Sequence, residues 1–341
     1  MSSLLTDDFG REVTDIRISL TDRCNFDCFY CHNEGLGDTR GPREPQENEM
    51  STAEVLRIAR IAHEFGIRNF KITGGEPMLR DDLEEIVGGI ADLEGTEVSM
   101  TTNGTYLAGR AEALAERGLE RINVSMDTND PEEFRDVTKG GIERVYDGID
   151  AALDAGLAPV KLNMVMAKPM RPYLDDMIEY VTDNDGLRLQ IIEYMPEIAG
   201  MPEFHVEIDE VKSLLSRRAD GVTTREIHNR SRYEIDGTVV EVVDPVENPE
   251  FCANCHRIRV THSGGLKGCL NRNDDVVSTL GATDDELRDK FRKVVADRVP
   301  YYGEYMVKDD DGNWVRNPEY EDGDADDGSD TDDILKLPVI N

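Results

Sequence analysis

The chain of 341 residues is long enough for one α/β barrel of about 200 to 250 residues together with a smaller appended region. Its 72 acidic and 38 basic residues give a net charge of −34, which argues against nucleic acid as a partner and favours a strongly solvated surface. No stretch approaches the roughly 18 consecutive apolar residues that a membrane span needs, so we expect no membrane association.

The sequence begins without an apolar secretory segment, and we therefore expect a cytoplasmic protein. Its surplus of acidic side chains suggests a cytoplasm rich in salt. At about 1 M ionic strength the Debye length falls to roughly 3 Å, which makes the self-repulsion of such a surface tolerable.

Short apolar runs alternate with helical periodicity along residues 15–195. Expected strands are 15–20, 69–73, 97–102, 121–126, 159–165 and 187–194, and expected helices are 51–65, 81–92, 107–117, 142–155 and 172–182. Six such strand-helix units predict an α/β fold with a parallel sheet, closed as a partial (β/α)6 barrel of the TIM type. Binding groups are expected at the C-terminal edge of that sheet.

The first expected strand is followed at once by a cysteine triplet, Cys24, Cys28 and Cys31, spaced C-x3-C-x2-C. Three thiolates are one short of the four that close an iron-sulfur cube or a structural zinc site, so one coordination position would stay open to a ligand. A disulfide is the less favoured alternative, because paired cysteines in a cytosolic chain more often bind metal or act in catalysis.

The second expected strand ends in Gly74 and Gly75, a pair that permits close backbone approach, although a plain strand-to-helix turn would explain it too. Three basic residues, Arg17, Lys71 and Lys161, also occur inside the expected strands. Arg17 and Lys161 each lie between two aliphatic residues, and Lys71 lies shortly before the glycine pair. Burying an unpaired charge against helices costs several kcal/mol, so these side chains are expected in the barrel lumen, where they would hold an anionic substrate.

After residue 196 the pattern changes, and we divide the chain into a barrel (10–196), an extension (197–300) and an acidic, disordered tail (301–341). The extension is expected to contain helices at 207–216 and 284–297, a hairpin of 232–235 with 238–243 around Asp236-Gly237, and a second hairpin of 256–261 with 266–270.

The second hairpin carries the second cysteine triplet, Cys252, Cys255 and Cys269. Zinc is the rival to an iron-sulfur cluster here, because His256 or His262 could complete a tetrahedron. Arg257 and Arg259 alternate along one strand and should face the same way, where guanidinium groups beside an open iron would suit a phosphate-bearing ligand. A pair of exposed arginines bridging surface acids is the alternative.

The first triplet, in the stretch TDRCNFDCFYC at 21–31, strongly resembles the radical S-adenosylmethionine (SAM) superfamily, as does the GGEP segment at 74–77. With the segments TTNG at 101–104, INVSMD at 122–127, IEYM at 192–195 and the C-x2-C-x-R-x-R-x9-C pattern at 252–269, roughly residues 10–300 resemble the GTP 3',8-cyclase (MoaA) family of molybdenum cofactor biosynthesis.

This resemblance implies two 4Fe-4S clusters, one on each triplet, in a lyase that uses SAM radical chemistry to convert GTP into (8S)-3',8-cyclo-7,8-dihydroguanosine 5'-triphosphate. It implies SAM contacts by Tyr30, Gly75, Ser125 and Met195. It implies GTP contacts by Arg17, Lys71, Thr101, Lys161, Arg257, Ile258 and Arg259. The implied partners are a reducing electron-transfer protein, the downstream cyclic pyranopterin monophosphate synthase and a second copy in a homodimer.

Two features depart from the family pattern. Lys71 stands where the family usually has Arg, and the sequence ends Leu337-Pro338-Val339-Ile340-Asn341 in place of the usual Gly-Gly. One alternative is a radical SAM peptide-modifying enzyme with an auxiliary cluster, although such enzymes usually carry more than three cysteines after the barrel. The other is a non-catalytic zinc or electron-transfer protein, which would not explain the GGEP segment or the basic lumen.

Overall fold

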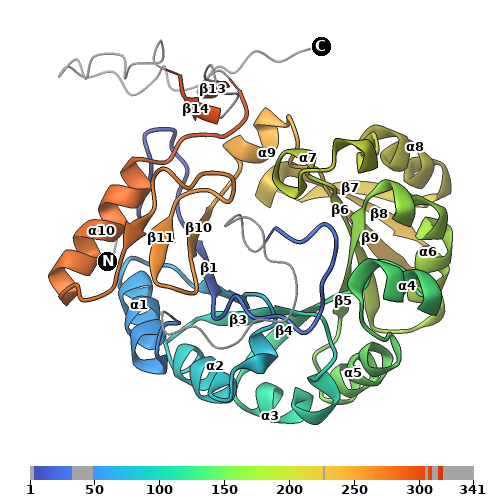
Figure 1. Ribbon diagram of the computed structural model, residues 1–341, viewed down its shortest axis with the longest axis horizontal. Helices are drawn as coiled ribbons and strands as arrows, with labels where there is room; N and C mark the ends of the chain where they lie inside the picture. The colour runs from blue at the N-terminus through green and yellow to red at the C-terminus, as the bar shows by residue number, and fades with distance from the viewer. Residues whose placement is uncertain (1–3, 33–48, 226, 304–305, 309–313, 318–341) are drawn as a thin grey trace.

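A computed structural model describes residues 4–32, 49–225, 227–303, 306–308 and 314–317. In this part of the chain one sheet of twelve strands curves around a central lumen, in the order β12-β11-β10-β1-β2-β3-β4-β5-β6-β9-β8-β7 (Figure 1). Its middle eight strands are all parallel: β10 Arg257–Val260, β1 Asp15–Ser19, β2 Asn69–Thr73, β3 Glu97–Thr102, β4 Leu119–Ser125, β5 Val160–Met166, β6 Leu187–Glu193 and β9 Thr238–Val243.

Antiparallel strands flank this parallel arc at both ends. Strands β11 (Gly265–Lys267) and β12 (Val277–Ser278) follow β10, and β8 (Arg230–Ile235) and β7 (Gly221–Arg225) follow β9. The partial, open α/β barrel predicted from the sequence is thus confirmed, and the extension adds one parallel strand to each edge of the six. The division into barrel and extension stays a prediction, since one sheet runs through both.

Helices cover the outer face of the sheet (Figure 1). They are α1 Thr52–Glu64, α2 Leu83–Ala91, α3 Ala111–Glu116, α4 Pro131–Thr138, α5 Glu143–Asp154 and α6 Leu174–Asp183, with α7 Pro196–Ala199, α8 Ile208–Arg218, α9 Pro249–Ala253 and α10 Asp284–Ala296 in the extension. Short 3₁₀ turns occur at Pro77–Leu79, Leu107–Gly109, Lys168–Tyr173, Pro202–Phe204 and Ile227–Asn229. None of the helices in the described ranges is long and apolar enough to cross a membrane.

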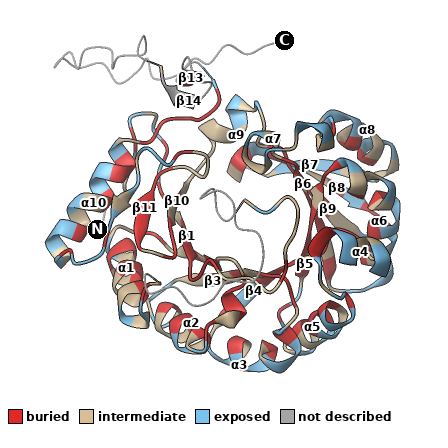
Figure 2. Ribbon diagram, in the orientation of Figure 1, coloured by how far each residue is buried: buried red, intermediate tan, exposed pale blue. Residues whose placement is uncertain are grey.

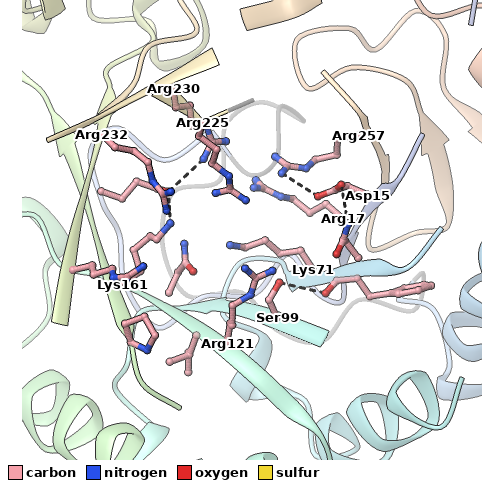
Figure 3. A pocket seen from close by; sticks show the side chains of 17 residues that line it. Asp15, Arg17, Lys71, Ser99, Arg121, Lys161, Arg225, Arg230, Arg232 and Arg257 are labelled. Atoms are coloured by element: carbon pink, nitrogen blue, oxygen red, sulfur yellow. Dashed lines mark hydrogen bonds and ion pairs between the residues drawn. The ribbon is translucent and has the colours of Figure 1, made fainter. Parts of the chain in front are cut away.

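The alternation of side chains along each strand separates the core from the lumen. On β1, Ile16 and Ile18 are fully buried in the hydrophobic core, whereas Arg17 between them points into the lumen (Figure 3). Figure 2 shows that the strands around the lumen combine buried and partly exposed residues. Helix α1 begins with the capping box expected of Ser51 and Glu54, in which each side chain bonds the other residue's backbone N–H. Local sequence and burial therefore agree on where these elements lie.

Several elements differ from the sequence-based expectation. The expected helix at 107–117 is divided at Arg110 into a 3₁₀ turn and α3. Helix α4 was not predicted, although Asp130 caps its N-terminus and Pro131 begins it. Strand β7 was also missed, because its central residues are exposed and give no alternating pattern. Within the predicted tail, β13 (Met306–Lys308) pairs with β14 (Trp314–Arg316), and 309–313 and 318–341 lie outside the described residues.

Candidate functional site

The two cysteine triplets lie at opposite edges of the parallel sheet. The first triplet follows the C-terminal end of β1, whereas Cys252 and Cys255 precede the N-terminal end of β10. Because β1 and β10 are parallel neighbours, with Asp15 beside Arg257, the start of β10 lies at the edge opposite to the first triplet. Cys269 returns to this second edge, since β11 runs antiparallel to β10. The lumen therefore separates the two triplets.

At the C-terminal edge lies a cavity of about 230 Å³, here called the upper cavity. The residues lining it include the whole first triplet together with Tyr30, Gly75, Ser125 and Met195, which sequence reasoning had assigned to SAM. Thr101, which had been assigned to GTP, lines this cavity as well. The fold thus brings together five residues from four different strand ends and the cysteine loop. Their roles stay predictions.

The glycine pair after β2 packs directly on the cysteine loop. The N–H of Gly75 donates to the carbonyl of Thr21 at 2.7 Å, and a Cβ at position 75 would lie 2.1 Å from the carbonyl oxygen of Arg23. The close approach expected of the two glycines is therefore made, at least in part, by the chain's own backbone. The segment at 74–77 fixes the position of the loop that carries the first triplet.

Two buried carboxyl groups tie neighbouring strand ends together beside the upper cavity. Glu76 accepts hydrogen bonds from the Thr102 hydroxyl and the Asn103 N–H, both at 2.7 Å, while burial raises its pKa to about 7. Asp127 accepts from the Tyr30 hydroxyl and, at 2.8 Å, from the Val165 N–H, while burial raises its pKa to about 6. Sequence reasoning did not single out these two acids as site residues.

The first triplet suits a metal cluster by its chemistry. All six cysteines of the chain are free thiols. Burial raises the pKa of Cys24 to about 12 and that of Cys28 well above its usual value. Such thiols become thiolates only when a positive group binds to them. Within the described ranges no three His, Cys, Asp or Glu side chains meet as ligands of one ion, and a cube does not require this, since each thiolate binds a different iron.

The lumen contains a second cavity, of about 270 Å³, here called the basic cavity (Figure 3). Arg17, Lys71 and Lys161, all predicted to face the lumen, line it together with Arg257, which was predicted to bind an anionic ligand beside the second triplet. Five further cations that sequence reasoning missed also line it: Arg121, Arg188, Arg225, Arg230 and Arg232. Nine cationic side chains in one cavity of an acidic protein indicate a polyanionic ligand.

Signals for the missed cations were present in the sequence. Arg188 lies between Leu187 and Leu189, the same pattern that identified Lys161. Arg230 and Arg232 alternate along β8 in the way that Arg257 and Arg259 alternate along β10. Their position in the lumen could not be inferred, because nothing in the sequence indicates that β8 joins the end of the barrel sheet.

Two predicted GTP contacts on β10 are placed differently from Arg257. Ile258 is fully buried in the hydrophobic core, so its side chain faces away from the lumen. Arg259 projects on the same face as Arg257 and is the register neighbour of Arg17, but it is not among the residues that line the basic cavity. The expected division of β10 into a basic and an aliphatic face is confirmed.

A buried acid lies among the cations. Glu241 of β9 is 2.7 Å from the Lys161 Nζ and within 3.6 Å of guanidinium nitrogens of Arg225 and Arg230. Although burial alone would raise its pKa, these cations hold the pKa of Glu241 at about 2. Burial and the neighbouring Arg17 and Arg257 lower the pKa of Lys71 well below its usual value. Seven arginines line the cavity besides the two lysines, so it retains a large positive excess despite Glu241 and the lowered pKa of Lys71.

The second triplet lies at the N-terminal edge of the parallel sheet. Burial raises the pKa of Cys252 to about 12, whereas Arg298, Arg257 and Arg11 outweigh burial and lower the pKa of Cys255. The zinc alternative loses one of its candidate ligands: His262 lies beyond the far end of β10 from Cys255, 4.0 Å from Asp22. His256 bonds through its Nδ1 to the carbonyl of Glu12 at 2.8 Å.

Comparisons with known families agree with these observations. Residues 18–180 match the Radical SAM superfamily, and residues 187–304 match the Molybdenum Cofactor Synthesis C family. The chain is similar to the probable GTP 3',8-cyclase of Halobacterium salinarum, with 54% identity over 95% of this chain and 97% of that one. It is also similar to the probable GTP 3',8-cyclase of Methanocella arvoryzae, with 43% identity over 89% and 97%.

Solved structures share the fold at low identity. The structure of Streptococcus suis SuiB bound to S-adenosylmethionine has a TM-score of 0.61 and 16% identity, and the match covers 82% of this chain and 65% of SuiB. Native anSMEcpe with bound AdoMet has a TM-score of 0.59 and 16% identity, over 82% of each chain. These likenesses support the partial barrel.

Proposed function

The chain belongs to the GTP 3',8-cyclase family of the radical SAM superfamily, and we propose that it converts GTP into (8S)-3',8-cyclo-7,8-dihydroguanosine 5'-triphosphate, the first step of molybdenum cofactor biosynthesis. The observation that carries this proposal is the position of the basic cavity, which lies in the lumen between two cysteine triplets at opposite edges of one sheet. A nucleoside triphosphate has the charge that nine cationic side chains attract.

In this proposal the upper cavity holds SAM against the first triplet. Tyr30, Gly75, Ser125 and Met195 would contact SAM, and the first triplet would hold three irons of a 4Fe-4S cluster. When bound, such a cluster would supply the electron for cleaving SAM into methionine and a deoxyadenosyl radical. Enclosure within the barrel would protect a reactive radical from solvent.

The residues of the lumen would orient GTP between the two edges. Arg17, Lys71, Lys161 and Arg257 line the basic cavity and would bind the triphosphate, with Arg259 beside them on β10. The second triplet would hold a second 4Fe-4S cluster, to which the guanine would bind.

Reconstitution without oxygen tests the proposal. We expect about eight irons per chain, four for each cube, and formation of 5'-deoxyadenosine that depends on GTP when SAM and a reductant are present. The cyclised triphosphate should appear in the mass spectrum of the products. Fewer than two clusters, or a rate of 5'-deoxyadenosine formation that is the same with and without GTP, would contradict the proposal. The second outcome would favour a peptide substrate.

The double variant Arg257→Ala with Arg259→Ala tests the substrate contacts. Charge-assisted hydrogen bonds contribute about 1.5 to 3 kcal/mol each, so we expect GTP affinity to fall at least tenfold while SAM affinity is kept. Equilibrium binding of both ligands measures this. Arg217→Ala on the exposed side of α8 is the control. Unaltered GTP binding by the double variant would remove β10 from the site.

Four finer assignments belong to the same proposal. We propose that the enzyme is a lyase, that a separate reducing protein supplies its electrons, and that a cyclic pyranopterin monophosphate synthase consumes its product. A homodimer is proposed on the family resemblance alone.

A further inference from the structure

A buried group of three charged residues lies beside the second triplet. The carboxylate of Asp7 is fully buried, and it is 2.9 Å from the Nε of Arg11 and 3.5 Å from the Nη1 of Arg298. Arg298, which follows α10, has a side chain that is 1% exposed, and the Arg11 side chain is 5% exposed. We call Asp7, Arg11 and Arg298 the buried triad.

The buried triad contacts the peptide of all three cysteine segments. Arg11 donates from Nη1 to the carbonyl of Cys252 at 2.9 Å, and Arg298 donates from Nη2 to the carbonyl of Cys255 at 2.5 Å. The third segment packs on Arg298, since a Cβ at Gly268, the residue before Cys269, would lie 2.6 Å from the Cγ of Arg298. The buried triad thereby connects the segment that carries Cys252 and Cys255 to the segment that carries Cys269.

The charges of the buried triad do not balance. Two guanidinium groups face one carboxylate, and an uncompensated buried charge is costly. In addition, among the described residues the Nη2 of Arg11 is buried without a hydrogen-bond acceptor, and the Nη1 of Arg298 makes no hydrogen bond although it lies 3.5 Å from the Asp7 carboxylate. Buried donors of this kind normally have an acceptor, so the buried triad would be balanced by a further anionic group that accepts hydrogen bonds.

A cube bound by three thiolates has these properties, since it is anionic and its sulfur atoms accept hydrogen bonds. Positive charge and N–H donors near such sulfur atoms favour the reduced, more negative state. We propose that Asp7, Arg11 and Arg298 are positioning residues that hold the second triplet in ligand geometry and raise the reduction potential of its cluster. This inference rests on the proposed function, which supplies the second cluster.

The test uses a full-length chain in which Cys24, Cys28 and Cys31 are replaced by Ala, so that only the second triplet can hold a cluster. Into this parent we introduce Arg298→Met, which keeps the length of the side chain but removes its charge and donors. We expect the equilibrium constant for one-electron reduction to fall about tenfold, a shift of about 59 mV to more negative potential, measured by redox titration with electron paramagnetic resonance. Arg298→Lys should keep most of the potential, because it keeps the charge.

The control is Arg288→Met, because Arg288 is on α10 and pairs with Glu64 at the surface. If the parent binds no iron, the second cluster of the proposed function is wrong. If the parent binds about four irons and Arg298→Met shifts the equilibrium less than threefold, the inference about the buried triad is overturned. Should Arg298→Met fail to fold, Arg11→Met is judged by the same threshold.

Discussion

At the scale of single residues, Glu241 controls the electrostatics of the basic cavity. Its side chain is 2% exposed and lies among Lys161, Arg225 and Arg230. The cations of this cavity repel one another while no anion is bound. One buried carboxylate lowers the free-energy cost of that repulsion. Removing one partner from a buried network leaves the others uncompensated, which typically costs about 3 to 5 kcal/mol.

We therefore predict that Glu241→Gln lowers the free energy of unfolding by about 3 kcal/mol at neutral pH. Inorganic triphosphate should restore part of the loss, because it supplies negative charge to the same cations. The pKa of Glu241 is about 2 in the folded chain and near 4.5 when unfolded, so its contribution is complete above pH 4.5 and is lost as pH falls toward 2. The difference in free energy of unfolding between the parent and Glu241→Gln should therefore become smaller at acidic pH.

Urea unfolding of both chains at pH 7 and pH 3 measures this gap. Glu234→Gln, at an exposed position on β8, serves as the matched control and should change little. A gap that is the same at both pH values would show that the charge of Glu241 is not the source of its effect.

At the scale of elements, the upper cavity depends on loops that follow neighbouring strands. The loop after β1 carries the first triplet, and the segment after β2 supports it through hydrogen bonds from Gly75 N–H to Thr21 and from Glu76 N–H to Arg23, both at 2.7 Å. Parallel strands bring these loops together at one edge, which is why residues about fifty positions apart form one site.

We predict that Gly75→Ala separates these two loops without unfolding the barrel. The added Cβ would lie 2.1 Å from the Arg23 carbonyl oxygen. This steric clash can be relieved only if the backbone of one of the two loops moves. SAM affinity should fall at least tenfold, measured by equilibrium binding on the reconstituted chain, while helical circular dichroism stays the same. Gly109→Ala is the control, because no atom lies within 4 Å of its added Cβ. Native SAM affinity in Gly75→Ala would contradict this account of the loop.

At the scale of the whole molecule, the two signs of charge are segregated. The chain has a net charge of −34, yet nine cationic side chains line one internal cavity. Acidic side chains therefore dominate the outside, where they repel one another, and the positive charges that would offset them are partly enclosed. The same segregation that prepares the lumen for an anion leaves the surface dependent on screening.

We predict that potassium chloride stabilises this protein up to molar concentration, because the Debye length falls from about 10 Å at 0.1 M to about 3 Å at 1 M. Thermal midpoints measured across this range should rise. At pH 4.5, where many surface carboxylates are protonated, the same salt series should give a smaller rise. A midpoint that is flat or falls with salt at pH 7 would contradict the prediction.

Much of the fold could be predicted because local sequence patterns determine many of its strands and helices. Alternation in β1, with Ile16 and Ile18 around Arg17, identified both a strand and its two faces. The capping box at Ser51 marked the start of α1. Cysteine spacing and the glycine pair after β2 predicted a site at the C-terminal edge, where the structure has the upper cavity. These signals involve residues a few positions apart, whose geometry the backbone itself fixes.

Contacts between distant segments were decided by the tertiary structure alone. The pairing of β10 with β1 and of β9 with β6 depends on which sheet edges are left exposed once the first six strands have formed, and that is a property of the folded sheet. This pairing places the second triplet at the opposite edge from the first and brings Arg230 and Arg232 into the lumen. By itself the sequence determined the strand faces, and it predicted the cluster ligands and an anionic substrate; only folding decided the distances between these groups.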